Sequence, residues 1–483
     1  MFAAQGDPTE AATAAPRKGV SQRVVAALLE LLGPDGVLTG DDVSTRNPGV
    51  FMSRIEADVL VRPTRTAEVS RVMEICHAAS QPVVVQGGMS GWVRATQTRP
   101  GDVVLSLERM KAIEEIDTVN RTATVQAGVI LQTLQEEAAR QGLFFPINLG
   151  GRGSCQLGGN ASTNAGGERV IRYGMMREQI LGLEAVLADG RVISSLNHMI
   201  KNNTGYDLKQ LFIGSEGSLG VITRLVVRLR EKATSSNTAL VCATRFEQVA
   251  RLLRHMDASL GGSLSAFELM DNAFYRVNTT SGRHAPPLPT DRPLYVIVES
   301  LGCDQDRDTA AFEQALMSAV EIGIADDVVV AKSDREREAI WIIREDLQHI
   351  VRDFSPFYAF DISLPVGDMA GYMDVVRQRV KSAWPEGSIA FLGHVGDGNL
   401  HIAVGAGGAD DRTRVEACIY EPLAGIGGSI SAEHGIGLEK KPWLSVTRNA
   451  EELRLMRQLK QTLDPQGILN PGKIFDMDAG AAT

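Results

Sequence analysis

Alternating apolar and polar positions divide the first 230 residues into short strands and amphipathic helices. Apolar residues recur at helical spacing over Arg23–Leu32 and Thr66–Ala79, and the first run ends at Gly33-Pro34, a strong helix-stop signal. The runs Asp58–Arg62 and Pro82–Val85 on either side of the second helix are predicted strands. A strand, helix and strand that lead into a glycine-rich loop are typical of an α/β fold.

The pattern of short strands continues to about residue 230 and then changes. Before that residue it predicts further strands at 102–107, 113–117, 122–127, 181–187 and 191–193, with a helix at 129–141. Beyond a polar stretch at 231–238, longer helices alternate with strands such as Leu294–Glu299, in a ferredoxin-like α+β order. We therefore predict a loose tail (1–17), a first domain (18–232), a cap domain (233–430) and a segment returning to the first domain (431–483).

Composition and charge narrow the classes of function. The 483 residues carry 49 Lys+Arg and 59 Asp+Glu, a net charge of −10, which argues against nucleic acid or an anionic membrane as the main partner. The five cysteines form no CxxC pair, so we expect a reducing compartment and no thiolate metal site. No apolar run approaches the ~18 residues of a membrane span, and the first residues lack a signal-peptide pattern. We predict a cytoplasmic enzyme.

Three glycine-rich loops, at 86–91, 150–167 and 214–223, are the first candidate binding elements. Glycine allows backbone N–H groups to approach an anion closely, because no Cβ intervenes. None of the loops contains GxGxxG at a strand–helix junction, so a Rossmann nicotinamide site is disfavoured. The loops suit a nucleotide, although tight turns in a large α/β protein would explain them equally well.

Two histidines bracket a predicted hairpin. If Asp397-Gly398 is a two-residue turn, His394 lies directly opposite His401, with Cβ atoms roughly 5 Å apart. Such a pair can hold one metal ion, and Glu433 could add a carboxylate if the backbone near Gly435 is irregular. This N/O ligand set suits Zn, Mn, Co or Fe. The alternative is that the two imidazoles are surface residues.

Residues 86–91, 158–167 and 205–220 resemble the FAD-binding half of the vanillyl-alcohol-oxidase type flavoproteins, and the nearest branch resembles the D-2-hydroxyglutarate and D-lactate dehydrogenases. The resemblance extends from about residue 20 to 476. It implies an α+β protein with a two-subdomain α/β FAD-binding domain and a ferredoxin-like cap over the flavin ring. Loop 86–95 contains no histidine, so we expect non-covalent FAD. The loop departs from the family at Trp92–Ala95, where small residues are more common.

The resemblance also implies roles for individual residues. The cofactor-binding set comprises Gln86, Gly87, Gly88, Met89, Ser90, Gly91, Ser154, Gly158, Gly159, Asn160, Thr163, Asn164, Gly166, Gly167, Gly220, Val221, Ile222 and Asn470. The positions matching His394, His401 and Glu433 bind a divalent metal, with Zn favoured, and the one matching His434 is the catalytic base. The segment Trp341–Glu345 resembles the one that brings an arginine, here Arg344, to a substrate carboxylate; the alternative is a surface arginine. With Arg344, Gln348 and His434 complete the implied substrate-binding set.

This chain departs from the 2-hydroxyglutarate branch at three positions. Gln348, Ala359 and Ala403 stand where that branch typically has Thr, Lys and Asn. The loss of the lysine weakens the case for a dicarboxylate, since a buried second carboxylate needs a charge partner.

We expect an FAD- and metal-dependent enzyme that oxidises a D-2-hydroxy acid to the 2-oxo acid. The metal binds the hydroxyl and a carboxylate oxygen, His434 takes the proton and flavin N5 receives the hydride. D-2-hydroxyglutarate and a monocarboxylate such as D-lactate both remain open as substrates. A metal-dependent hydrolase that uses the His/His/Glu set and an inactive flavoprotein are the alternatives from other classes. The expected partners are an electron-transfer flavoprotein or a quinone, with oxygen as an open alternative, and a homodimer is one open assembly.

Other reactive side chains receive ordinary interpretations. We interpret Cys155 as a packing residue, and the remaining histidines as ordinary surface or core residues: His77, His198, His255, His284 and His349.

Overall fold

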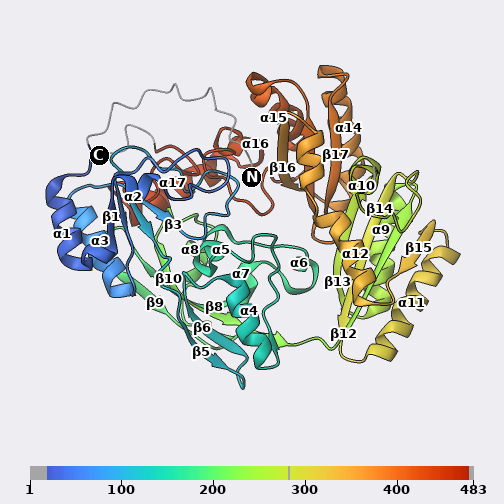
Figure 1. Ribbon diagram of the computed structural model, residues 1–483, viewed down its shortest axis with the longest axis horizontal. Helices are drawn as coiled ribbons and strands as arrows, with labels where there is room; N and C mark the ends of the chain where they lie inside the picture. Colours follow the sequence, from blue (N-terminus) through green and yellow to red (C-terminus); the bar gives the residue numbers. More distant parts are fainter. Residues whose placement is uncertain (1–18, 281–282, 478–483) are drawn as a thin grey trace. The chain divides into compact units, whose positions relative to one another are not determined.

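The computed structural model describes residues 19–280 and 283–477, and the chain divides into two units (Figure 1). Unit 1 contains the described chain up to Ala165, Met175–Lys232 and the chain from Glu433 onward. Unit 2 contains Gly166–Gly174 and Ala233–Ala432. The predicted tail at 1–17 lies outside the described residues. None of the described helices combines the length and apolarity needed to cross a bilayer.

The first sheet of unit 1 is short and mostly parallel. Its strand order is β1-β2-β4-β3, with β4 parallel to both of its neighbours. The strands are β1 (Val37–Thr39), β2 (Val59–Val61), β3 (Val83–Gln86) and β4 (Val103–Ser106). Runs of buried valine build these strands, as expected where both faces of a parallel sheet are covered. Helix α1 (Gln22–Leu32) packs against β1 and β2 and against helix α3 (Thr66–Ala78), and both helices have bounds close to those predicted.

The second sheet of unit 1 is antiparallel and five-stranded, in the order β5-β6-β10-β8-β9. Its strands are β5 (Ile113–Asp117), β6 (Thr122–Gln126), β8 (Ile180–Val186), β9 (Val192–Ser195) and β10 (Val221–Arg228). A two-stranded pair joins β7 (Leu143–Phe144) and β11 (Arg230–Glu231). The remaining helices of unit 1 are α2 (Asp41–Ser44), α4 (Leu131–Arg140), α5 (Leu157–Thr163), α7 (Met176–Gln179), α8 (Lys209–Phe212), α16 (Leu444–Thr447) and α17 (Ala450–Leu463).

Unit 2 is built on one seven-stranded antiparallel sheet in the order β15-β12-β14-β13-β17-β18-β16. The strands are β12 (Ser235–Ala243), β13 (Leu264–Asp271), β14 (Leu294–Gly302), β15 (Asp327–Val330), β16 (Phe357–Ser363), β17 (Ser388–His394) and β18 (Asn399–Gly405). Its helices are α6 (Val170–Tyr173), α9 (Phe246–Leu260), α10 (Asn272–Thr279), α11 (Gln305–Glu321), α12 (Asp334–Glu345), α13 (Gln348–Asp353), α14 (Met369–Ala383) and α15 (Arg412–Tyr420). The α+β class predicted for this part is confirmed.

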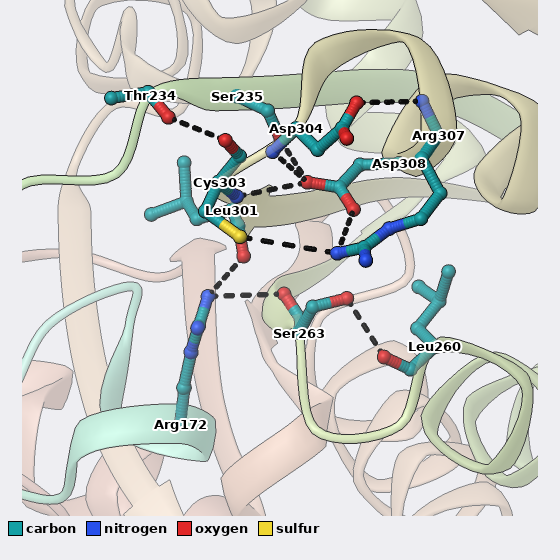
Figure 2. Close-up of polar contacts among 10 residues, drawn as sticks. All are labelled: Arg172, Thr234, Ser235, Leu260, Ser263, Leu301, Cys303, Asp304, Arg307 and Asp308. Atoms are coloured by element: carbon teal, nitrogen blue, oxygen red, sulfur yellow. Dashed lines mark hydrogen bonds and ion pairs between the residues drawn. The ribbon is translucent and has the colours of Figure 1, made fainter.

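A short segment from the middle of the chain belongs to unit 2. Arg172 of α6 donates hydrogen bonds to the carbonyls of Ser263 (3.3 Å) and Leu301 (2.5 Å), as Figure 2 shows. The chain that follows Leu301 is held by Asp308 of α11. The Asp308 carboxylate accepts hydrogen bonds from the backbone N–H of Cys303 at 2.9 Å and from the Ser235 hydroxyl at 2.6 Å. These bonds close the chain after β14 against the start of β12.

Candidate functional site

His394 and His401 lie on adjacent strands of unit 2, but not in the predicted register. The predicted two-residue turn at Asp397-Gly398 is wrong: β18 pairs His401 with Leu392, and a 3₁₀ turn at Val395–Asp397 lengthens the connection. The actual register differs from the predicted one by two residues. Because side chains alternate with period two, an even shift leaves both imidazoles on the same face as diagonal neighbours. Their ring centroids lie 5.1 Å apart, at 84°.

A buried carboxylate that the sequence analysis missed holds the first histidine. Glu268, on β13, is fully buried, and its Oε1 lies 2.6 Å from Nδ1 of His394. Burial pushes the pKa of Glu268 upward, but the contacts with His394 and Arg344 outweigh it and lower the pKa below its ordinary value. The carboxylate is therefore ionised at neutral pH, and it fixes the orientation of the imidazole.

Arg344 lies on the other side of the same carboxylate. Its Nη2 is 3.3 Å from Oε2 of Glu268, and the residue is 8% exposed, near the end of α12. The surface-arginine alternative is therefore wrong. The buried Nε of Arg344 has no hydrogen-bond partner among the described residues. An arginine held in this way keeps donor capacity for a bound carboxylate.

The second histidine also faces a buried acid. Asp361 on β16 pairs directly with His401 in the sheet, and its Oδ1 lies 3.6 Å from Nδ1 of His401. Asn399 donates from Nδ2 to the same Oδ1 at 2.8 Å. Histidines whose Nδ1 faces a carboxylate are typical of metal ligands, since the acid helps to orient the ring. Ligand atoms of His394 and His401 lie within 4.8 Å of each other, so these two residues fit a divalent metal.

Two of the three positions at which this chain departs from the 2-hydroxyglutarate branch are alanines, on the strand of His401 and on the strand beside it. Ala403 pairs with Ala359 on β16 and with Ala390 on β17, and it lies two residues from His401 on the same face. Gln348 begins α13, and its backbone N–H donates to Asp346. The positions that carry Lys and Asn in the 2-hydroxyglutarate branch thus form part of an alanine row.

Glu433 and His434 belong to the last segment of unit 1. Glu216, a third acid that the sequence analysis missed, holds the turn that follows them: its two carboxylate oxygens accept the backbone N–H groups of Ile436 (2.7 Å) and Gly437 (2.8 Å). Burial raises the pKa of Glu216, although these two donors oppose the shift. A Cβ at Gly435 would lie 2.8 Å from the same carboxylate, so the irregular backbone expected near Gly435 requires glycine.

The unusual tryptophan of the first glycine loop contacts the candidate base. The indole of Trp92 stacks on the imidazole of His434 with ring centroids 5.6 Å apart at 17°, and Phe51 meets the indole edge-on at 5.5 Å. Nearby, Arg94 forms an ion pair with Glu439. The departure from the family at Trp92–Ala95 thus builds the surroundings of His434.

Two of the glycine loops of unit 1, 86–91 and 150–167, pack against each other. A Cβ at Gly88 would lie 2.1 Å from the carbonyl oxygen of Ser154, and one at Gly158 would lie 2.5 Å from Cβ of Ala127, so both close approaches require glycine. Gly159 has open space where a Cβ would be, and the buried Oε1 of Gln156 has no hydrogen-bond partner among the described residues. Close backbone packing beside an open glycine and an unpartnered amide fits an extended nucleotide cofactor.

The remaining predicted cofactor residues fall at distinct places. Asn470 ties three segments of unit 1 together, because it accepts from the N–H of Val85 (2.9 Å) and donates to the carbonyl of Glu216 (2.6 Å). Asn160, Thr163 and Asn164 lie on α5 or at its end, and Val221 and Ile222 begin β10. Gly166 and Gly167 belong to unit 2. Cys155 is buried, which raises the pKa of its thiol, as fits a packing residue.

Comparison with known proteins agrees with the resemblance seen in the sequence. Residues 57–195 match the family model described as FAD binding domain, and residues 232–474 match that described as FAD linked oxidases, C-terminal domain. A relative named D-2-hydroxyglutarate dehydrogenase, mitochondrial, from Bos taurus is 37% identical, over 96% of this chain and 85% of its own. A D-2-hydroxyglutarate dehydrogenase of Xanthomonas citri is 37% identical, over 86% of this chain and 88% of its own.

A solved structure shares the fold. The chain of p-cresol methylhydroxylase with substrate bound superposes with a TM-score of 0.74, over 96% of this chain and 99% of its own, at 16% identity. At this identity the likeness concerns the fold alone.

Proposed function

The chain belongs to the FAD-linked oxidase family, in the branch of the D-2-hydroxyglutarate and D-lactate dehydrogenases, and from this membership we propose that it oxidises a D-2-hydroxy acid to the 2-oxo acid. That it is an FAD-linked oxidoreductase follows from the family. The class of substrate and the roles of the individual residues are what we propose.

The observation that carries the proposal is the chain of contacts from His394 through Glu268 to Arg344. One buried carboxylate orients an imidazole and neutralises an arginine that retains an unpartnered donor. In this arrangement Arg344 binds the substrate carboxylate with two parallel hydrogen bonds. Because Glu268 already balances part of its charge, the arginine is held in place before substrate arrives.

The remaining roles belong to the two histidine motifs. His394, His401 and Glu433 would hold one divalent ion, with Zn favoured and Mn, Co or Fe as alternatives, since the set offers two imidazoles and a carboxylate. His434 accepts the proton of the substrate hydroxyl, and Trp92 limits the rotation of its ring. FAD, when bound, supplies an acceptor for the hydride from the substrate Cα.

The alanine row favours a substrate with one carboxylate as a second candidate. Ala359 is exposed, but Ala403 and Ala390 are buried in the core of unit 2, and neither of these two supplies a donor or a charge. A distal carboxylate beside them would lose its hydration without compensation. D-lactate, or a longer monocarboxylic D-2-hydroxy acid, meets no such cost. Family membership favours D-2-hydroxyglutarate, and both acids belong in the test.

An anaerobic flavin-reduction screen tests the proposal. D- and L-2-hydroxy acids of increasing length and charge are mixed with the FAD-loaded protein, and bleaching of the flavin absorption is followed. We expect rapid bleaching by at least one D acid and slow bleaching by every L acid. Arg344→Met should raise the substrate concentration needed for half-maximal rate. Arg335→Met, an exposed position on the same helix, serves as the matched control. A flavin that no D-2-hydroxy acid bleaches would contradict the proposal.

A further inference from the structure

A second group of metal-ligating side chains lies elsewhere in unit 2. His284, Asp346 and His349 each offer one ligand atom, and these atoms all lie within 4.8 Å of one another. Nε2 of His284 is 2.9 Å from Oδ2 of Asp346, and Nε2 of His349 is 3.4 Å from the same oxygen. The two rings meet at 66° with centroids 6.1 Å apart. None of the three belongs to the candidate site described above.

The 3.4 Å separation matches that of two ligand atoms in a tetrahedral metal site, and the 2.9 Å separation is about 0.4 Å shorter. Ligand atoms at 2.0–2.2 Å from zinc in a tetrahedron lie about 3.3–3.6 Å from one another. A hydrogen bond from one imidazole would explain the 2.9 Å contact alone. A second hydrogen bond to the same oxygen would be 3.4 Å long, near the limit for such bonds, whereas 3.4 Å is an ordinary separation between two ligand atoms of one zinc ion.

The surroundings hold the three side chains in place. The other oxygen of Asp346, Oδ1, accepts the backbone N–H of Gln348 at 3.1 Å, which orients the carboxylate. The backbone N–H of His284 donates to Asn278, whose side chain in turn donates to the carbonyl of Ile343. The ligands therefore come from the loop after α10 and from the junction of α12 with α13, two segments already tied together.

The charge and exposure suit a divalent transition metal. Two neutral imidazoles and one carboxylate supply a single negative charge, so a bound dication keeps a net charge of +1 and an open position for water. The side chains are 17–23% exposed, which leaves a path for the ion from solvent. Nitrogen ligands favour Zn, Co, Ni or Cu over Mg or Ca.

We propose that His284, Asp346 and His349 form a second divalent-metal site, of the zinc type, that joins the end of α10 to the α12–α13 junction. Asp346 lies two residues after Arg344 and two before Gln348. A metal ion at this site restrains the segment that carries the proposed substrate arginine. The site itself does not depend on the proposed function, because its ligands are outside the candidate active site.

Metal stoichiometry tests the site in the FAD-loaded full chain. Chelator-treated protein is dialysed to equilibrium against zinc, and protein-bound zinc is measured by elemental analysis. The double variant His284→Gln/His349→Gln should hold one equivalent less than the parent. Its flavin content and circular dichroism should be unchanged. The matched control, His255→Gln, changes a histidine of the same unit whose Nε2 contacts the carbonyl of Ala315, and it should retain the parent stoichiometry.

Two further variants make the result decisive. Asp346→Asn removes the charged ligand with little change in shape, and it should weaken the binding of one equivalent by more than the roughly 10–100-fold that loss of a supporting partner costs. His394→Gln should remove a different equivalent and leave this one in place, which separates the two sites. Equal zinc content and affinity in the parent, the double variant and Asp346→Asn would overturn the proposal.

Discussion

Glu268→Gln is the most informative single change in this protein. Glutamine keeps the shape and an oxygen that can accept from His394, but it removes the negative charge that Arg344 faces at 3.3 Å. Glu268 is fully buried and Arg344 is 8% exposed, so water cannot replace the lost partner. Removal of one member of a buried ion pair costs about 3–5 kcal/mol, because it leaves an uncompensated charge.

The pH dependence of this effect has a defined sign. The pKa of Glu268 is lowered in the folded chain, so its ionised form stabilises folding above the unfolded value near 4.3. This contribution is lost as the pH falls through the lowered pKa. The difference in stability between parent and variant should therefore be full at pH 7 and shrink in strong acid.

Urea unfolding of the FAD-loaded protein, followed by circular dichroism, measures the cost. The control is Glu338→Gln, an exposed carboxylate on α12 that should change the unfolding free energy by less than about 0.5 kcal/mol. The double variant Glu268→Gln/Arg344→Met should cost less than the sum of the two single variants, since it removes both charges. If Glu268→Gln unfolds with the same midpoint and slope as the control, the buried pair does not have the role assigned to it.

Three other changes test separate parts of the site. His434→Ala should slow anaerobic flavin reduction by about 10²–10⁴-fold while the protein keeps its FAD; an unchanged rate would exclude His434 as the base. Trp92→Leu removes a stacked ring contact of about 0.5–1.5 kcal/mol, so flavin reduction measured by stopped flow should slow by roughly 2–10-fold. Trp92→Phe should give an intermediate rate. Equal rates in the parent and both variants would count against a positioning role for Trp92. Burial raises the pKa of Asp271 to about 6, so this carboxyl should destabilise the parent increasingly as the pH rises from about 4 to about 6. Relative to the parent, Asp271→Asn should therefore gain about 2–3 kcal/mol of unfolding free energy between these two pH values. Parallel pH profiles of the two proteins would show that Asp271 does not titrate in this way.

Local pattern was sufficient for most elements of the fold. The helix predicted at Thr66–Ala79 spans Thr66–Ala78, and the strand predicted at Asp102–Leu107 spans Val103–Ser106. Helical spacing and runs of valine are properties of neighbouring residues, so they can be read without the rest of the chain. The hairpin at Asp397-Gly398 failed because its register is set by the pairing of β17 with β18 and not by the turn residues alone.

The histidine motifs and the glycine loops could be identified from the sequence alone, because each is a short run of chemically distinctive residues. Only the tertiary structure revealed Glu268, Asp361 and Glu216, whose carboxylates contact residues up to 221 positions away. An acidic residue within an apolar strand is a weak signal that a partner exists, since an unpaired buried charge is costly. The identity of that partner depends on which strands pair and in which register. The packing of the whole chain decides the strand pairing and its register, and no local pattern of residues encodes them.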